Sequence, residues 1–245
     1  MSPARTLRVR YSDLNVICMA TKKDKSHYLA RFYPGGYFHV YGRTNNREPL
    51  YRNDDQRQFF LEKYAQYLGD YVDTFAWCLM ENHFHLLVRV KDENHLLQYI
   101  TGIPELMRTA AQQLFLETPP IDRDYHPVLE RQFTRLFTTY AMRVNAEQKR
   151  SGNLFYRPFK RVEVTDINHL VWLVYYIHSN PVKHGVYTKL SDYRWSSYKA
   201  MLSQDSTKIA RSEVLEWFGG LDYFKNFHLS AVDIPESVEY LDIEY

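Results

Sequence analysis

The feature that most constrains the fold is a pair of apolar stretches, residues 72–79 and 84–90, separated by a short polar break. Runs of this length that are rich in β-branched and aromatic residues are typical of two antiparallel strands joined by a tight turn. Successive side chains of a strand point to opposite faces, so His83 and His85 share one face and Phe84 takes the other. The sequence therefore predicts a hairpin with His83 at its mouth, two imidazoles side by side, and an aromatic anchor in the core behind them.

The rest of the chain alternates strand and helix patterns around this hairpin. Because proline lacks an N–H group and disfavours helical geometry in the residue before it, the helix capped by Asp166 is expected to end at Asn180. Strands are expected over residues 37–43 and within the basic segment 154–164, and helices over residues 54–69, 94–117 with a break at 102–104, 128–150, 195–203, 211–218 and 221–228. This order predicts an α+β domain, an antiparallel sheet covered by helices, with a C-terminal helical extension.

Composition excludes several classes of protein. The 245 residues are 45% hydrophobic and 16% aromatic, which is enough for a sizeable core. No run of about 18 apolar residues indicates a transmembrane helix, so no membrane partner is expected. The two cysteines are too few for a disulfide framework or a cysteine zinc site, and Cys78 is expected to be a buried thiol. These features favour a cytoplasmic protein.

The formal net charge of +2 conceals an asymmetry. Residues 231–245 carry five acidic side chains and no Lys or Arg, which leaves 31 basic against 24 acidic side chains in the remainder. A surplus of this kind suits a polyanionic partner. The acidic tail is expected to be a mobile terminus, with masking of the basic face as the alternative.

The paired histidines suit a metal site. Neutral imidazoles are the commonest metal ligands in proteins, and carboxamide or carboxylate oxygens would complete a site for Mg²⁺ or Mn²⁺. The alternative is that His83 and His85 are two ordinary hydrogen-bonded histidines.

A second element supplies chemistry for such a site. Tyr176 and Asn180 are four residues apart and share a face of a helix. A tyrosine hydroxyl beside a divalent metal can attack phosphorus, and Asn180 can offer the metal an oxygen. The alternative makes Tyr176 a core aromatic and Asn180 a helix cap.

A third element is basic and aromatic. Residues 143–161 hold six basic side chains and one acidic one, with Phe155, Tyr156 and Phe159 between them. Cations hold phosphates while aromatic faces stack on unpaired bases. A solvated charged face is the alternative.

These elements occur together, in this order, in a known family. The chain resembles the REP-associated tyrosine transposases, a branch of the HUH-type single-tyrosine transposases, in which HUH denotes histidine, a bulky apolar residue and histidine. The resemblance extends from about residue 35 to about residue 228. It departs from the family at Glu81, where a proline is usual, and at Gly42 and Thr44, where Asn and Gly are usual. The motifs that carry it are residues 45–49, 78–88, 151–155, 176–182 and 192–198.

The resemblance implies a ferredoxin-like domain that cleaves single-stranded DNA beside palindromic hairpins, with Mg²⁺ or Mn²⁺. His83, His85 and Asn180 would hold the metal, and Tyr176 would attack the scissile phosphate, leaving a 5′-phosphotyrosine link and a free 3′-hydroxyl. The residues expected to contact DNA are Arg47, Phe155, Tyr156, Arg157, Lys160, Arg161 and Lys183. The expected division of the chain is an N-terminal extension (1–34), a catalytic domain (35–200), a helical extension (201–230) and an acidic tail (231–245).

The leading hypothesis is therefore a DNA-nicking and DNA-joining transposase, monomeric or homodimeric and associated with the nucleoid, and Tyr175 is the substitute nucleophile if Tyr176 fails. One alternative is a domesticated protein that binds hairpin DNA without cutting it. A further alternative is a metal-dependent RNA nuclease.

Overall fold

The computed structural model describes residues 28–45, 48–156 and 158–230. The expectations for Arg47, Arg157, residues 1–27 and the acidic tail 231–245 concern parts of the chain outside this description. The domain boundaries at residues 34 and 200 stay predictions.

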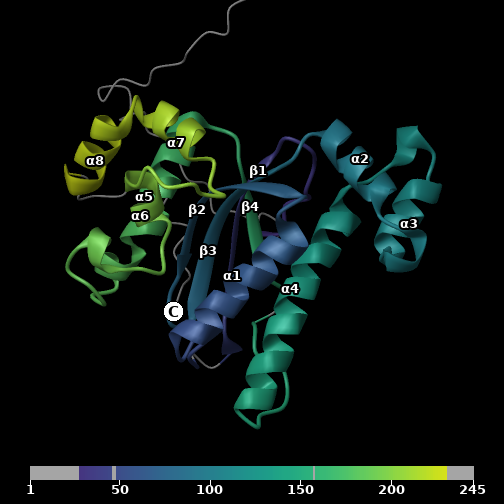
Figure 1. The fold of residues 1–245 in the computed structure, drawn as a ribbon, viewed down its shortest axis with the longest axis horizontal. Coiled ribbons are helices and arrows are strands. Elements are labelled where there is room, and N and C mark those ends of the chain that lie inside the picture. The colour runs from purple at the N-terminus through teal and green to yellow at the C-terminus, as the bar shows by residue number, and fades with distance from the viewer. Residues whose placement is uncertain (1–27, 46–47, 157, 231–245) are drawn as a thin grey trace, which may run out of the picture.

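A four-stranded antiparallel sheet forms the centre of the molecule (Figure 1). Its strands and the two helices that connect them are β1 (Tyr37–Arg43), α1 (Asp54–Leu68), β2 (Val72–Leu79), β3 (His83–Val90), α4 (His126–Glu147) and β4 (Lys160–Val164). The strand order is β2-β3-β1-β4, and every neighbouring pair is antiparallel. The succession βαββαβ in this order is that of a ferredoxin-like fold. The predicted α+β class and the predicted hairpin of β2 and β3 are confirmed.

One face of the sheet is covered by α1 and α4 and is filled with aromatic rings. Phe84 is fully buried there, and its ring centroid lies 5.4 Å from that of Phe60 on α1 and 5.4 Å from that of Phe137 on α4. Gly42 is the register partner of Phe84, and a Cβ atom at position 42 would come within 3.0 Å of the Phe84 ring. The prediction that Phe84 anchors β3 in the core is confirmed.

The opposite face carries α5 (Ile167–Lys183), which packs on β2 and β3. The prediction that this helix ends at Asn180 is wrong, because it continues through Pro181. A proline this close to the end of a helix removes only one main-chain hydrogen bond, and the carbonyl of Asn180 still accepts from the N–H of His184 at 3.0 Å. Asn180 therefore keeps helical geometry one turn after Tyr176.

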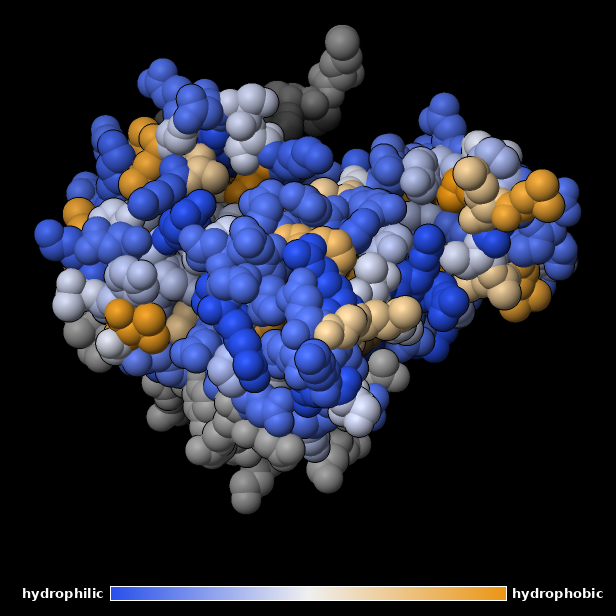
Figure 2. Space-filling view, turned by 60° about the horizontal axis from the view of Figure 1, so that its bottom comes forward, coloured by the Kyte–Doolittle hydropathy of each residue, from blue (hydrophilic) through white to orange (hydrophobic). Residues whose placement is uncertain are grey.

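A helical insertion separates β3 from α4 and projects from the sheet (Figure 1). It consists of α2 (Glu93–Gly102), η4 (Glu105–Met107), α3 (Ala110–Glu117) and η5 (Pro120–Asp122), and the predicted break after Gly102 is confirmed. Figure 2 shows hydrophobic residues gathered at this end of the molecule, beside a largely hydrophilic central face. The most exposed are Leu106, Met107, Leu114 and Ile121.

Short helices complete the described chain: η6 (Leu190–Asp192), α6 (Tyr198–Leu202), α7 (Arg211–Phe218) and α8 (Leu221–Ser230). α7 stops at Gly219, whose φ of 84° is a left-handed conformation that glycine adopts without strain. Cys78 on β2 is fully buried, as predicted. Within the described ranges, none of the helices combines the length and apolar character that crossing a membrane requires.

Candidate functional site

β3 and α5 bring the predicted metal and nucleophile residues to one place. The ring centroids of His83 and His85 are 5.1 Å apart, and that of His85 lies 5.4 Å from the Tyr176 ring. Nε2 of His83 lies 3.3 Å from Oδ1 of Asn180. All four side chains are at most 2% exposed. The strand alternation and the four-residue helical spacing thus converge on one buried cluster.

Hydrogen bonds fix the orientation of two of these groups. Nδ2 of Asn180 donates to the carbonyl of Tyr176 at 2.8 Å, so the oxygen Oδ1 is the atom that faces His83. Nδ1 of His83 lies 2.7 Å from Oδ1 of Asn82, which can only accept, so this nitrogen carries the proton. In a neutral His83 the Nε2 lone pair then faces the lone pairs of Asn180 Oδ1. Two acceptors held in this way are stabilised by a proton or a cation between them.

His85 has a free coordinating atom of the same kind. Its Nδ1 lies 2.9 Å from Nε2 of His39 on β1, whereas its own Nε2 is buried and makes no hydrogen bond within the described residues. Burial holds the pKa of His85 well below its usual value, the neighbouring imidazoles of His39, His83 and His184 add to the shift, and the side chain of Asn180 opposes it. His85 is therefore neutral, which is the form of imidazole that binds metals.

The donor set fits a divalent cation. Ligand atoms on adjacent corners of an octahedral site with bonds of about 2.1 Å lie about 3 Å apart, close to the separation of His83 Nε2 and Asn180 Oδ1. The described chain offers no group of three or more His, Cys, Asp or Glu side chains that could hold a metal. The carboxamide oxygen of Asn180, which faces Nε2 of His83, is therefore the group that could add a third donor to the two imidazoles.

His39 is the residue of this site that the sequence analysis missed. It is fully buried, and burial lowers its pKa to about 3. If His85 held a metal through Nε2, its proton would lie on Nδ1 and would be donated to Nε2 of His39, an arrangement that orients the ring. The signal was present in the alternation of residues 37–43, which puts His39 and Tyr41 on the face that carries His85.

A second buried hydrogen-bond chain fixes the other side of α5. His228 Nδ1 donates to the carbonyl of Phe224 at 2.9 Å, so its Nε2 accepts from His178 Nδ1 at 3.0 Å. His178 Nε2 accepts in turn from the hydroxyl of Ser197 at 2.7 Å, and Ser197 Oγ accepts from the N–H of Trp77 on β2 at 3.0 Å. This chain joins α8, α5 and β2 and holds the helix that carries Tyr176 against the sheet.

Three of the residues expected to contact DNA are accessible. Lys183 is exposed, with Nζ 5.5 Å from the centre of the Tyr176 ring. Lys160 is partly exposed, and its Nζ lies 5.7 Å from the centre of the Tyr41 ring. Tyr156 is 50% exposed, and the guanidinium of Arg43 lies 5.3 Å from its ring centre. These groups offer charge and an aromatic face.

Two others are not at the surface. Arg161 is 4% exposed, and its guanidinium pairs with Glu130 at 3.2 Å and donates to the carbonyl of Ala30 at 2.7 Å. Phe155 is 7% exposed, with its ring centroid 5.1 Å from that of Phe137 in the core. Both side chains belong to the packing of the fold. The sequence analysis expected them at the DNA because a basic and aromatic pattern does not distinguish inward from outward side chains.

No protein-family model matches the chain. The chain is 26% identical over 174 residues to a putative REP-associated tyrosine transposase of Haemophilus influenzae, an alignment that covers 71% of this chain and 85% of the relative. Among solved structures it is similar to a REP-associated tyrosine transposase bound to a REP hairpin, with a TM-score of 0.48 and 16% identity over 76% of this chain and 87% of the other. The sequence relative confirms the resemblance that the motifs indicate, to the REP-associated tyrosine transposases.

Proposed function

We propose that this chain cuts and rejoins single-stranded DNA beside hairpins, with Tyr176 as the nucleophile and Mg²⁺ or Mn²⁺ held by His83, His85 and Asn180. The convergence of a tyrosine from α5 with two imidazoles and an oriented carboxamide is the observation that carries the proposal. The Haemophilus influenzae relative supports DNA as the substrate.

The reaction is an exchange of one phosphodiester for another. The Tyr176 oxygen attacks the scissile phosphorus, the new O–P bond forms as the bond to the 3′-oxygen breaks, and the phenolic proton passes to water while the departing oxygen takes one up. The protein remains linked to the 5′-phosphate, and attack by a 3′-hydroxyl reverses the step without an external energy source. When bound, the divalent cation neutralises charge on the phosphate oxygens.

The remaining residues position these groups. Asn180 ties its amide to the carbonyl of Tyr176, so ligand and nucleophile are coupled through one helical turn. Lys183 lies over the Tyr176 ring and puts a positive charge beside the phosphate that the ring approaches. Lys160 and Tyr156 offer a cation and a stacking face to the strand.

A covalent-adduct assay tests the proposal. The full chain is incubated with a 5′-labelled and, separately, a 3′-labelled DNA hairpin that carries single-stranded flanks, with Mg²⁺ or Mn²⁺, and the products are separated on a denaturing gel. The wild type is expected to form a protein adduct on the 5′ end of the downstream fragment. Tyr176→Phe is expected to lose it by at least about 10³-fold, because no other oxygen takes the place of the nucleophile.

Tyr175→Phe is the matched control. The Tyr175 ring packs 5.8 Å from Phe227 and 5.5 Å from His228 on α8, away from the histidines of β3. This variant is expected to retain the adduct. An adduct that survives Tyr176→Phe and is lost in Tyr175→Phe would reverse the assignment, and hairpin binding with no adduct under either metal would favour a protein that binds DNA without cutting it.

A further inference from the structure

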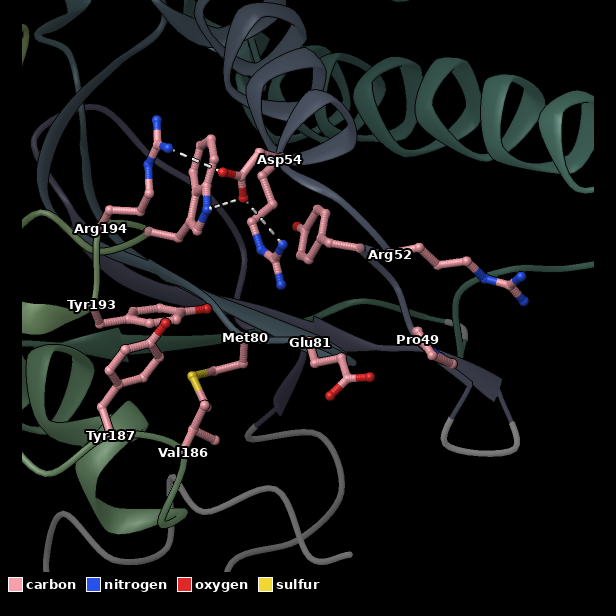
Figure 3. Close-up of a pocket in the computed structure, with 12 residues that line it drawn as sticks. Pro49, Arg52, Asp54, Met80, Glu81, Val186, Tyr187, Tyr193 and Arg194 are labelled. Atoms are coloured by element: carbon pink, nitrogen blue, oxygen red, sulfur yellow. Dashed lines mark hydrogen bonds and ion pairs between the residues drawn. The ribbon is translucent and has the colours of Figure 1, made fainter.

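A pocket of about 600 Å³ opens beside the turn between β2 and β3 (Figure 3). Its walls come from the segment around Pro49–Arg57, from Met80 and Glu81 in the turn, and from residues 186–195 after α5. The main chain ties these walls together, because the carbonyl of Glu81 accepts from the N–H groups of Leu50 at 2.7 Å and Tyr51 at 3.0 Å. The turn continues directly into β3, so the pocket is fixed relative to its first histidine.

Aromatic rings form much of the lining. Tyr187 is 41% exposed, and its ring centroid lies 5.2 Å from that of Tyr193, whose hydroxyl donates to the carbonyl of Leu79. Tyr51 and Trp195 line the pocket farther in. An exposed ring supported by a fixed one is a platform on which a nucleic-acid base can stack.

Three of the charged side chains that line the pocket form ion pairs with one another. Asp54 accepts from Trp195 Nε1 at 2.6 Å and from Arg194 at 3.0 Å, so its carboxylate is already paired. Arg57 pairs with the same carboxylate at 3.7 Å and donates to the carbonyl of Asn53 at 3.4 Å, and its guanidinium lies 5.5 Å from the centre of the Tyr51 ring. The lining therefore combines aromatic surface with Asp54, Arg57 and Arg194, whose charges are paired with one another.

Glu81 is the unusual member of this lining. Its side chain is exposed, and its carboxylate makes no hydrogen bond or ion pair with the described part of the chain (Figure 3). A carboxylate repels the phosphates that the neighbouring cations attract, so it serves poorly as a backbone contact. It is an acceptor-only group and suits the edge of a base that presents N–H donors.

Only one base presents two adjacent donors on its Watson–Crick edge. Guanine offers N1–H and N2–H₂, which match the two oxygens of a carboxylate. Adenine and cytosine each put an acceptor beside their amino group, and thymine flanks its N3–H with two carbonyls, so each of these bases sets a lone pair against the carboxylate.

We propose that this pocket receives one unpaired guanine of the DNA strand that passes the candidate site, stacked on Tyr187 and read by Glu81. The proposal rests on the proposed function for its ligand and adds a residue that determines specificity. It also gives a role to Glu81, the position at which the chain departs from the proline usual in the resembling family.

Binding measurements with the full chain test whether Glu81 recognises guanine. A DNA hairpin with single-stranded flanks is varied through all four bases at each flank position, and the dissociation constants are measured by fluorescence anisotropy. At one position the wild type is expected to prefer guanine by about tenfold or more, the discrimination of a bidentate contact. Glu81→Gln is expected to reduce that preference to within about threefold, whereas the control Glu105→Gln, an exposed acid on η4, is expected to retain it.

An abasic nucleotide separates stacking from a general effect. Tyr187→Ala is expected to weaken binding of the guanine oligonucleotide by about tenfold and to leave binding unchanged when that position is abasic, because the lost contact is to the base. Tyr223→Ala, on the exposed side of α8, is the control.

Three results would contradict the proposed recognition of guanine. Binding without a base preference at any position, or losses that are the same on the abasic strand, overturns the pocket as a base reader. Tighter binding of Glu81→Gln to every oligonucleotide shows a carboxylate that only repels backbone and overturns it as well. Failure of the wild type to bind any hairpin overturns the proposed function first, and the pocket's role with it.

Discussion

The two faces of the central sheet differ in chemistry although the same strands build both. On the face covered by α1 and α4, Phe84 lies among aromatic rings that make no polar contact. On the face covered by α5, the residues before and after it, His83 and His85, lie among imidazoles, a tyrosine and an amide that are just as deeply buried.

The two faces are stabilised by different means. The aromatic face is stabilised by apolar burial, which is non-directional and requires only that the side chains fill the available space. The polar face must satisfy each buried donor and acceptor, and its hydrogen bonds therefore dictate tautomers and orientations, as at His83 and Asn180. Buried atoms on that face, such as Nε2 of His85, remain without a partner among the described residues. The aromatic face thus stabilises the fold through apolar burial, and the polar face carries the candidate site.

The largest effect on stability is expected from a substitution on the aromatic face. Phe84→Ala should lower the free energy of unfolding by about 3–5 kcal/mol, because it removes a fully buried ring and leaves a cavity between α1 and α4. Urea unfolding followed by circular dichroism measures the change. Phe84→Leu, which keeps most of the apolar volume, should cost less.

The site should respond differently to the same substitution. At temperatures where Phe84→Ala is folded, its affinity for Mn²⁺ should equal that of the wild type, since the substituted side chain lies on the opposite face from the imidazoles of the proposed metal site. A loss of stability below about 1 kcal/mol would show that the ring is not part of the core that the structure describes.

The sequence predicts the aromatic face and the members of the site well because both follow from short-range periodicity. A period of two separates Phe84 from the histidines, and a spacing of four aligns Tyr176 with Asn180. The end of α5 was mispredicted because the rule for Pro181 weighs one lost hydrogen bond and ignores the packing of the last turn against the sheet.

Other features depend on contacts between distant segments and leave weaker signals. His39 joins the site only through the register of β1 with β3, and the inward direction of Arg161 and Phe155 depends on α4. The pocket at Glu81 needs three segments to meet, and no local pattern encodes that.

A smaller effect is expected at the support of the polar face. His39→Phe should lower the affinity for Mn²⁺ by about 10–100-fold, because His85 loses the acceptor that orients its ring. Isothermal titration calorimetry measures the affinity, and His39→Gln, which retains an acceptor, should recover part of it. Unchanged affinity in His39→Phe would mean that His39 serves packing alone, and a loss explained by unfolding would be seen in the urea midpoint.

The smallest effect expected is the change in the free energy of unfolding with pH, which involves the chain of hydrogen bonds between α8, α5 and β2. Burial lowers the pKa of His228 to about 3, and protonating it would set a second N–H against the N–H that His178 already donates. Between that value and the unfolded pKa of about 6.5, the unfolded state binds the extra proton, so the free energy of unfolding falls as the pH decreases. The slope is about 1.4 kcal/mol per pH unit for each such histidine, or about 2 kcal/mol from pH 7 to pH 5.

Two variants separate the titration from the hydrogen bonds. His228→Gln removes the titrating group, so the slope of the free energy of unfolding against pH should decrease by the contribution of one histidine. Ser197→Ala removes the hydroxyl that donates to His178 but keeps both imidazoles, so it should lower stability at every pH and leave the slope unchanged. If His228→Gln instead keeps the full slope, acid sensitivity resides elsewhere, and the aromatic surroundings of His228, including Phe224 at a ring separation of 4.0 Å, do not exclude its charged form.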